Sequence, residues 1–123
     1  MSTVMPSPAL TSPVFTGRRT FRFALSDYAH AAAESLGTGW NADDLFLGAS
    51  GLVFTTDGTW SFRLYVDHDN DLTVTDRYDG SEAIVPTFEL GTAPMDFIEL
   101  AEWGKAIADV IRHHVVANLH RRG

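Results

Sequence analysis

The chain is 123 residues long and 45% hydrophobic, which predicts one globular domain and leaves no room for a second. It has no cysteine, so disulfides, thiolate zinc sites and cysteine nucleophiles are excluded. No apolar run approaches the roughly 20 residues that a membrane span needs, and the start of the chain lacks the apolar stretch of a signal peptide. We therefore expect a soluble cytoplasmic protein.

The net charge of −7 is unevenly distributed along the chain. Residues 1–25 carry a net charge of +3, residues 26–104 carry −13, and residues 105–123 carry +3. The acidic body would repel the phosphates of nucleic acids, and it would attract a basic partner, a cation or the basic ends of a second copy. The alternative is that the acidic loops only keep a small domain soluble.

The first part of the chain predicts a tail followed by a short strand. Residues 1–17 are rich in proline, serine and threonine, which is typical of a disordered or loosely attached segment. We expect a single α+β domain over residues 18–123. Its first element would be a short strand at residues 18–25, where apolar side chains alternate with others.

A short helix is predicted over residues 26–36, because apolar residues recur there at a spacing of three to four. Ser26 would cap its first turn with the side-chain hydroxyl, and Gly37 would end it in a left-handed conformation. The apolar face is thin, so the helix must lie close to whatever it covers. This face consists of Tyr28, Ala29, Ala32, Ala33 and Leu36.

Short strands joined by tight turns are expected next. Residues 45–48 and 52–55 are short and apolar. Residues 60–66 alternate apolar and polar side chains, which is the clearest strand pattern in the chain. Asp57 and Gly58 lie between the last two segments and are typical of a two-residue hairpin turn.

The hairpin predicts a register for its two strands. In the simple register, Val53 and Phe62 lie opposite each other on the buried face. Phe54 then points to the other face beside Ser61. Because that leaves an aromatic ring outside the core, either a bulge shifts the register or the second face is covered too.

Two further strands are predicted at residues 72–75 and 83–90. Leu72 and Val74 would point into the core from the first of them. Pro86 interrupts the second, and a proline cannot donate a hydrogen bond to a neighbouring strand. The second strand is therefore expected at the edge of the sheet or to contain a bulge.

A long helix of about six turns is the strongest structural prediction, and Pro94 suits its first turn. Gly104 lies within its apolar stripe, where a missing side chain permits close approach to another element. Ile98 and Val116 emerge on the polar side, which suggests a contact outside the core of this domain. The stripe consists of Phe97, Leu100, Ala101, Gly104, Ile107, Ala108, Ile111, Val115 and Leu119.

These elements predict the fold class. Strands joined by hairpins, with no helix between them, exclude a doubly wound parallel sheet. We expect an α+β two-layer sandwich. It would contain an antiparallel sheet of four to five strands, flanked by a short N-terminal helix and a long C-terminal helix.

One acidic loop has part of the pattern of a calcium site. Asp67, Asp69 and Asp71 have the spacing of the first ligands in a calcium-binding loop. However, Leu72 stands where the sharp turn needs glycine, and Tyr78 stands where a bidentate carboxylate is needed. We interpret the segment as an acidic hairpin turn, with a weak cation site as the alternative.

No catalytic signature is found in the sequence. His113 and His114 are not followed one helical turn later by a second metal ligand, because Ala117 and Asn118 occupy those positions. No serine lies in a nucleophile elbow, and no glycine-rich phosphate loop precedes a helix. We therefore predict no catalytic residue, metal or cofactor.

Two functions remain open. The charge segregation favours a small acidic protein-interaction module: a regulatory, inhibitory or adaptor protein, one version being a DNA-mimicking inhibitor of a nucleic-acid enzyme. Its partner would be a protein with a basic surface, or a second copy bound through the C-terminal helix, and neither nucleic acid nor a membrane. The alternative is an enzyme or small-ligand-binding protein with carboxylate and histidine acid–base chemistry in a pocket between sheet and helices. The predicted binding residues are Asp67, Asp69, Asp71, Asp76, Asp79, Ile98 and Val116.

Overall fold

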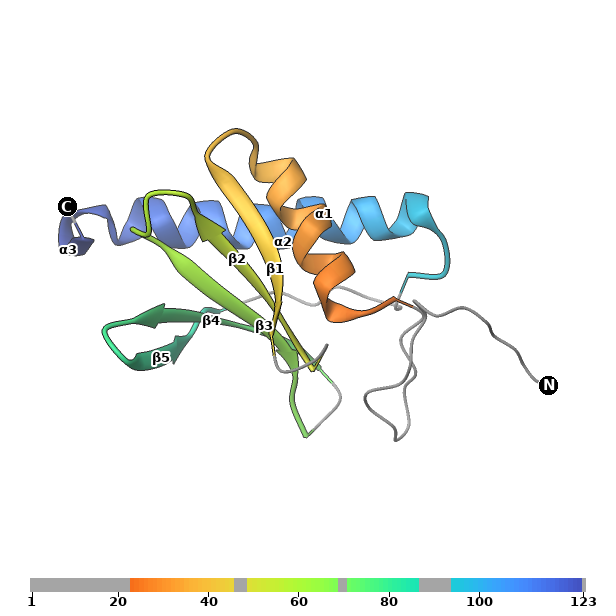
Figure 1. Ribbon diagram of the computed structural model, residues 1–123, viewed down its shortest axis with the longest axis horizontal. Coiled ribbons are helices and arrows are strands. Elements are labelled where there is room, and N and C mark those ends of the chain that lie inside the picture. The colour runs from red at the N-terminus through yellow and green to blue at the C-terminus, as the bar shows by residue number, and fades with distance from the viewer. Residues whose placement is uncertain (1–22, 46–48, 69–70, 87–93, 123) are drawn as a thin grey trace.

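The computed structural model describes residues 23–45, 49–68, 71–86 and 94–122, so the predicted tail at residues 1–17 lies outside it. The predicted α+β sandwich is confirmed: the described residues form a five-stranded antiparallel sheet with a short and a long helix (Figure 1). The sheet has the order β1-β2-β3-β4-β5, so each strand pairs with the next along the chain. The elements are α1 (Leu25–Leu36), β1 (Trp40–Leu45), β2 (Ser50–Thr55), β3 (Ser61–Val66), β4 (Leu72–Tyr78), β5 (Ser81–Ile84), α2 (Phe97–Ala117) and α3 (Leu119–Arg122).

The hairpin between β2 and β3 has the predicted register, but its loop is longer than the predicted two-residue turn. The backbone N–H of Thr55 donates to the carbonyl of Trp60 at 3.0 Å, so residues 56–59 form the loop. Val53 pairs with Phe62, and both side chains are fully buried. Phe54 pairs with Ser61 on the opposite face, where its ring is half-buried. The second face is therefore partly covered, and the predicted register is confirmed without a bulge at these positions.

Helix α1 lies directly on the inner face of the sheet, as its thin alanine face predicts. Ala29 and Ala32 are fully buried. A Cβ atom added at Gly51 of β2 would lie 2.5 Å from the carbonyl oxygen of Leu25, so only a glycine lets the helix approach this closely. The core between the layers contains Phe62, Leu64, Val74, Tyr28, Trp103, Ile107 and Ile111.

Helix α2 crosses α1 at Gly104 (Figure 1). A Cβ atom at that position would lie 2.6 Å from the Cβ atom of Ala31, which confirms the predicted close approach. The C-terminal half of α2 continues over β3 and β4, where His114 contacts Phe62. Of the helices in the described part of the chain, none combines the length and apolar character of a membrane-spanning segment.

The start of α1 differs from the prediction. The helix begins at Leu25 and its N-cap is Ala24, two residues before the predicted cap, Ser26. The carboxylate of Asp27 accepts a hydrogen bond from the backbone N–H of Ala24 at 3.0 Å, so the cap is supplied from inside the first turn. Leu25, which was assigned to a strand, is buried as the first helical residue.

Two strands also differ from their predicted bounds. The strand expected at residues 45–48 lies earlier, as β1, and residues 46–48 are outside the described residues. β1 was missed because it contains asparagine and aspartates, which are rare in strands. As an edge strand it tolerates them, because Asn41 and Asp43 point to solvent. β5 lies at the other edge of the sheet, but it begins two residues before the strand predicted at residues 83–90 and ends at Ile84. Residues 87–90 of that predicted strand lie outside the described residues. Ile84 is exposed and the next residue, Val85, is buried.

Helix α2 begins later than predicted. Its N-cap is Asp96, whose side chain accepts a hydrogen bond from the backbone N–H of Glu99, and Pro94 precedes the helix. Most of the stripe between Leu100 and Ile111 is buried, but Ala101 is exposed. Phe97 is 78% exposed and Leu119 is 53% exposed, although the pattern predicts that both face the core. The first turn of α2 extends past α1 (Figure 1), so less of the fold is available to cover it.

Candidate interaction surface

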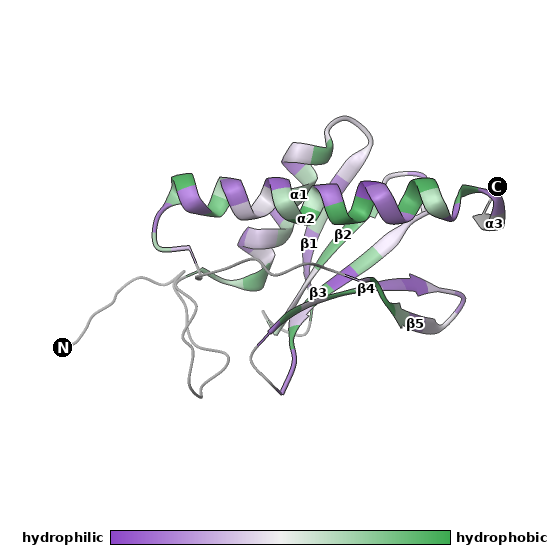
Figure 2. Cartoon of the chain, turned by 180° about the vertical axis from the view of Figure 1, so that it is seen from behind, coloured by the Kyte–Doolittle hydropathy of each residue, from purple (hydrophilic) through white to green (hydrophobic). Residues whose placement is uncertain are grey.

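The side of α2 that faces away from the sheet forms a continuous row, which we call the outer seam. Successive seam residues are alternately four and three positions apart, and this spacing keeps side chains on one side of a helix. The buried side of the helix, from Leu100 to Ile111, packs against the sheet and α1. Figure 2 shows α2 in front of the rest of the fold along its length. The outer seam consists of Ile98, Glu102, Lys105, Asp109, Arg112 and Val116, all exposed.

The two ends of the outer seam are apolar. Ile98 is 75% exposed and Val116 is 69% exposed, as their position on the polar side of the helix predicts. They are 18 residues apart, which is five helical turns or about 27 Å. Met95 and Leu119, also exposed, flank them. Large apolar side chains that remain open to solvent in this way are typical of contact surfaces.

The centre of the outer seam is charged, with acidic and basic residues in alternation. The carboxylate of Glu102 lies 3.7 Å from the ammonium group of Lys105, and that of Asp109 lies 3.0 Å from the guanidinium group of Arg112. The guanidinium group of Arg112 also donates to the backbone carbonyl of Ser35 at the end of α1. Because these pairs are exposed, they add little to the stability of the fold.

The predicted acidic binding residues are not gathered in one place. Asp67 and Asp71 lie in the turn between β3 and β4, whereas Asp79 lies beyond the opposite end of β4, in the turn to β5. The carboxylate of Asp67 accepts hydrogen bonds from the backbone N–H of Asp71 at 3.0 Å and from the hydroxyl of Thr73 at 3.3 Å. Its oxygens therefore order the turn itself.

The structure does not test the alternative of a cation site at this turn, because Asp69 lies outside the described residues. Across the ranges that are described, no three histidine, aspartate or glutamate side chains are grouped so that they could hold a metal ion. We therefore interpret Asp67 and Asp71 only as part of an acidic surface at this end of the sheet. Asp43 and Asp44, at the end of β1, lie at the same end.

Asp76 does not belong to the exposed acidic surface to which it was assigned. Its side chain is 8% exposed and points inward from β4, where a carboxylate oxygen lies 2.8 Å from Nε2 of His114. The histidine ring stands edge-on to the rings of Trp60 and Phe62. This pair joins the end of α2 to the sheet.

The environment of His114 favours a structural role for the pair. Nε2 contacts Asp76, and Nδ1 lies 3.4 Å from the side-chain amide nitrogen of Asn118. With both ring nitrogens used inside the protein, neither is directed at a substrate. The sequence carries a signal for this contact: Asp76 continues the inward parity of Leu72 and Val74, and His114 continues the buried stripe of α2.

The alternative function requires a pocket between the sheet and the helices. The described feature that most resembles one is a hollow between the end of α1 and the start of β1. It is shallow and open to solvent. It does not include Asp76 or His114, so the buried pair and the hollow are separate. The lining residues are His30, Ala33, Glu34, Gly37, Trp40, Asn41 and Ala42.

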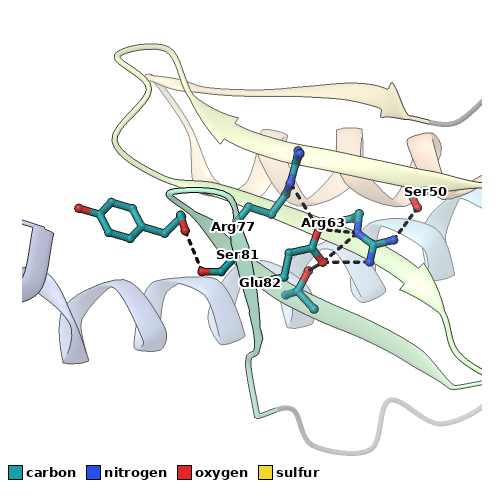
Figure 3. A network of polar contacts seen from close by, with 7 residues as sticks. Ser50, Arg63, Arg77, Ser81 and Glu82 are labelled. Carbon is teal, nitrogen blue, oxygen red and sulfur yellow. Dashed lines mark hydrogen bonds and ion pairs between the residues drawn. The ribbon is translucent and has the colours of Figure 1, made fainter.

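The outer face of the sheet is covered by a polar network (Figure 3). The guanidinium group of Arg63 donates to both carboxylate oxygens of Glu82 at 2.9 to 3.1 Å and to the hydroxyl of Ser50 at 3.2 Å. The hydroxyl of Thr75 donates to Glu82 at 2.9 Å. The hydrogen bonds from Arg63 are the main reason that the pKa of Glu82 lies below its usual value. The network buries Ser50 and Thr75, so we interpret it as a cover for the sheet.

Similarity to other proteins does not assign a family to this chain. Comparisons with protein-family models, with curated proteins and with solved structures each found no match. The exposed surfaces and buried pairs described above are therefore the basis for a proposed function.

Proposed function

We propose that this chain is a small protein-interaction module that works in the cytoplasm and binds a partner through the outer seam of α2. The observation that carries the proposal is the exposure of Ile98 and Val116 on a helix whose other side is well packed. Covering each of these side chains with a partner would gain about 1 to 2 kcal/mol from apolar burial. In the described part of the fold, both side chains remain mostly exposed to solvent.

The acidic body supports binding to a protein with a basic surface. Residues 26–104 carry a net charge of −13, and opposite charge mainly accelerates association rather than strengthening the final complex. Asp67 and Asp71 contribute to this field from one end of the sheet. The DNA-mimicking version has less support, because Asp79 is separated from these two residues by the length of β4.

The buried pair of Asp76 and His114 is the observation that favours the alternative, an enzyme with acid–base chemistry. Its geometry supports that function less well than a structural role, because both nitrogens of the histidine are engaged within the protein. The open hollow beside α1 is lined by other residues. Binding without catalysis is therefore the proposal that the described surfaces support best.

Photo-crosslinking in native cell extract tests the proposal. A photoreactive side chain at position 98 should form a crosslink to a discrete partner, and the same side chain at position 84 should not. Ile84 is a matched control because it is 69% exposed but lies on β5. The further substitution Val116→Ser should weaken the crosslink from position 98. Equal labelling from positions 98 and 84 would contradict the proposal.

A further inference from the structure

We propose that the outer seam binds a second copy of this chain, with the two α2 helices antiparallel about a twofold axis. This inference rests on the proposed function, but it names a second copy in place of the basic partner that the acidic body favours. The outer seam itself carries two acidic and two basic residues, so its own net charge is zero. In a twofold interface the same surface is used by both copies, so each contact between residues i and j occurs twice. The residues of the seam must therefore match the same residues of the second copy running in the opposite direction.

The sequence of the seam satisfies this condition in a single register. In this register the twofold axis crosses the seam at the level of position 107 along the helix. Each seam residue then faces the residue of the other copy for which the two residue numbers add up to 214. Both apolar ends then meet, and every charge meets one of opposite sign. The three contacts, each formed twice, are Ile98 with Val116, Glu102 with Arg112, and Lys105 with Asp109.

Other arrangements of the two helices are disfavoured. A parallel pair in register would place each seam residue against its own copy, which gives four layers of like charge. An antiparallel pair shifted by seven residues keeps some charge pairs but places Ile98 against Asp109, or Val116 against Lys105. The unshifted antiparallel register avoids both costs, and this difference specifies the geometry.

The fold leaves room for a second helix. The outer seam lies opposite the side of α2 that packs on the sheet, and in Figure 2 none of the described helices and strands lies in front of α2. Two helices can therefore approach to the usual 8 to 10 Å. Arg112 already bonds to Asp109 and to Ser35, but its guanidinium group has five N–H donors and its side chain is 47% exposed. Donors thus remain for Glu102 of the second copy.

The predicted dimer is weak. A single pair of helices buries less surface than a standard stable interface. Only the two end layers are apolar, and the four charged layers are exposed to solvent and salt. We expect a dissociation constant on the order of tens of micromolar, which falls among reversible associations.

Sedimentation analysis of the full chain, over concentrations spanning about two decades on either side of that constant, tests the inference. Lys105→Asp places two aspartates opposite two others, and Asp109→Lys places lysines opposite lysines. Each variant alone should bind itself at least about tenfold more weakly than the wild-type chain does. An equal mixture of the two should recover dimers, because both contacts between positions 105 and 109 then join opposite charges. Asp43→Lys makes the same charge change as Asp109→Lys at an exposed position of β1, so it is the control and should leave the association unchanged.

The recovery in the mixture shows that both variants are folded, and thermal unfolding of each variant checks the same point. A wild-type chain that stays monomeric at the highest concentration overturns the inference. Self-association that is unchanged in both charge-reversal variants also overturns it, and so does a mixture of the two variants that stays monomeric. A monomer that still crosslinks from position 98 to another protein would overturn the self-association but leave the interaction module standing. Loss of the crosslink as well would overturn both.

Discussion

Replacing Gly104 by alanine should destabilise the fold, although alanine is the better helix former. Gly104 lies where α2 crosses α1, and the added Cβ atom would be 2.6 Å from the Cβ atom of Ala31. It would also lie 2.7 Å and 2.8 Å from the backbone carbonyl carbon and oxygen of Ala31. Backbone atoms cannot turn away as a flexible side chain can, so the two helices must separate.

The magnitude follows from two opposing contributions. Overpacking a well-packed contact by one methyl group costs about 2 to 3 kcal/mol when the neighbours are backbone atoms. Alanine returns about 1 kcal/mol relative to glycine in a helix interior. We therefore expect a net loss of about 1 to 2 kcal/mol in the free energy of unfolding.

Urea unfolding, followed by tryptophan fluorescence and far-ultraviolet circular dichroism, measures this loss. Ala101→Gly, on the exposed side of the same helix, isolates the contribution of helix propensity. Adding Ala31→Gly to Gly104→Ala should recover part of the stability, because one of the three close contacts is removed. If Gly104→Ala is as stable as the wild type or more so, α1 and α2 are not in contact here and the reasoning is refuted.

Three further substitutions test other contacts by the same unfolding measurement. The pKa of Glu82 lies below its usual 4.5, chiefly because an arginine hydrogen-bonds to the carboxylate. The ionised carboxylate therefore stabilises the fold above pH 4.5, and this stabilisation is lost as the pH falls through the lower pKa of the folded state. Glu82→Gln should therefore cost about 0.5 to 1 kcal/mol at neutral pH and much less in acid below the folded pKa; an equal cost under both conditions would contradict this. His114→Phe keeps an aromatic ring but removes the hydrogen bond to buried Asp76, so we expect a loss of about 2 to 3 kcal/mol in the free energy of unfolding. An unchanged free energy of unfolding would mean that the pair does not hold α2 against the sheet. Asp27→Ala should cost about 1 kcal/mol and Ser26→Ala much less, and the reverse order would restore Ser26 as the cap.

Local patterns were sufficient to predict the central hairpin and the exposed side of the long helix. The alternation from Trp60 to Val66, together with the Asp57–Gly58 turn, predicted both the β2–β3 hairpin and the pairing of Val53 with Phe62. The period of α2 predicted that Ile98 would be exposed. Each of these inferences depends on residues within one or two turns or one hairpin, where backbone geometry decides which side chains share a face.

The errors occurred where a neighbouring element outweighed local preference. Asn41 and Asp43 disfavour a strand, but β1 pairs along β2 and directs both side chains to solvent. Phe97 fits the apolar stripe, but the first turn of α2 has too little of the fold beside it to be covered. In both cases, burial depended on what the rest of the chain placed alongside.

For this protein, the amino-acid sequence alone determined the order and type of the main elements and the alternating row of charges on the last helix. Tertiary structure alone decided which polar groups meet. Asp76 and His114 are 38 residues apart, and the pattern of each segment indicates only that its side chain points inward, not that the two side chains meet. Among the described residues, the same packing left Ile98 and Val116, the two ends of the row, mostly exposed to solvent. The reason is physical: periodicity sets the direction of a side chain relative to its own backbone, but its contacts depend on how separate elements pack together.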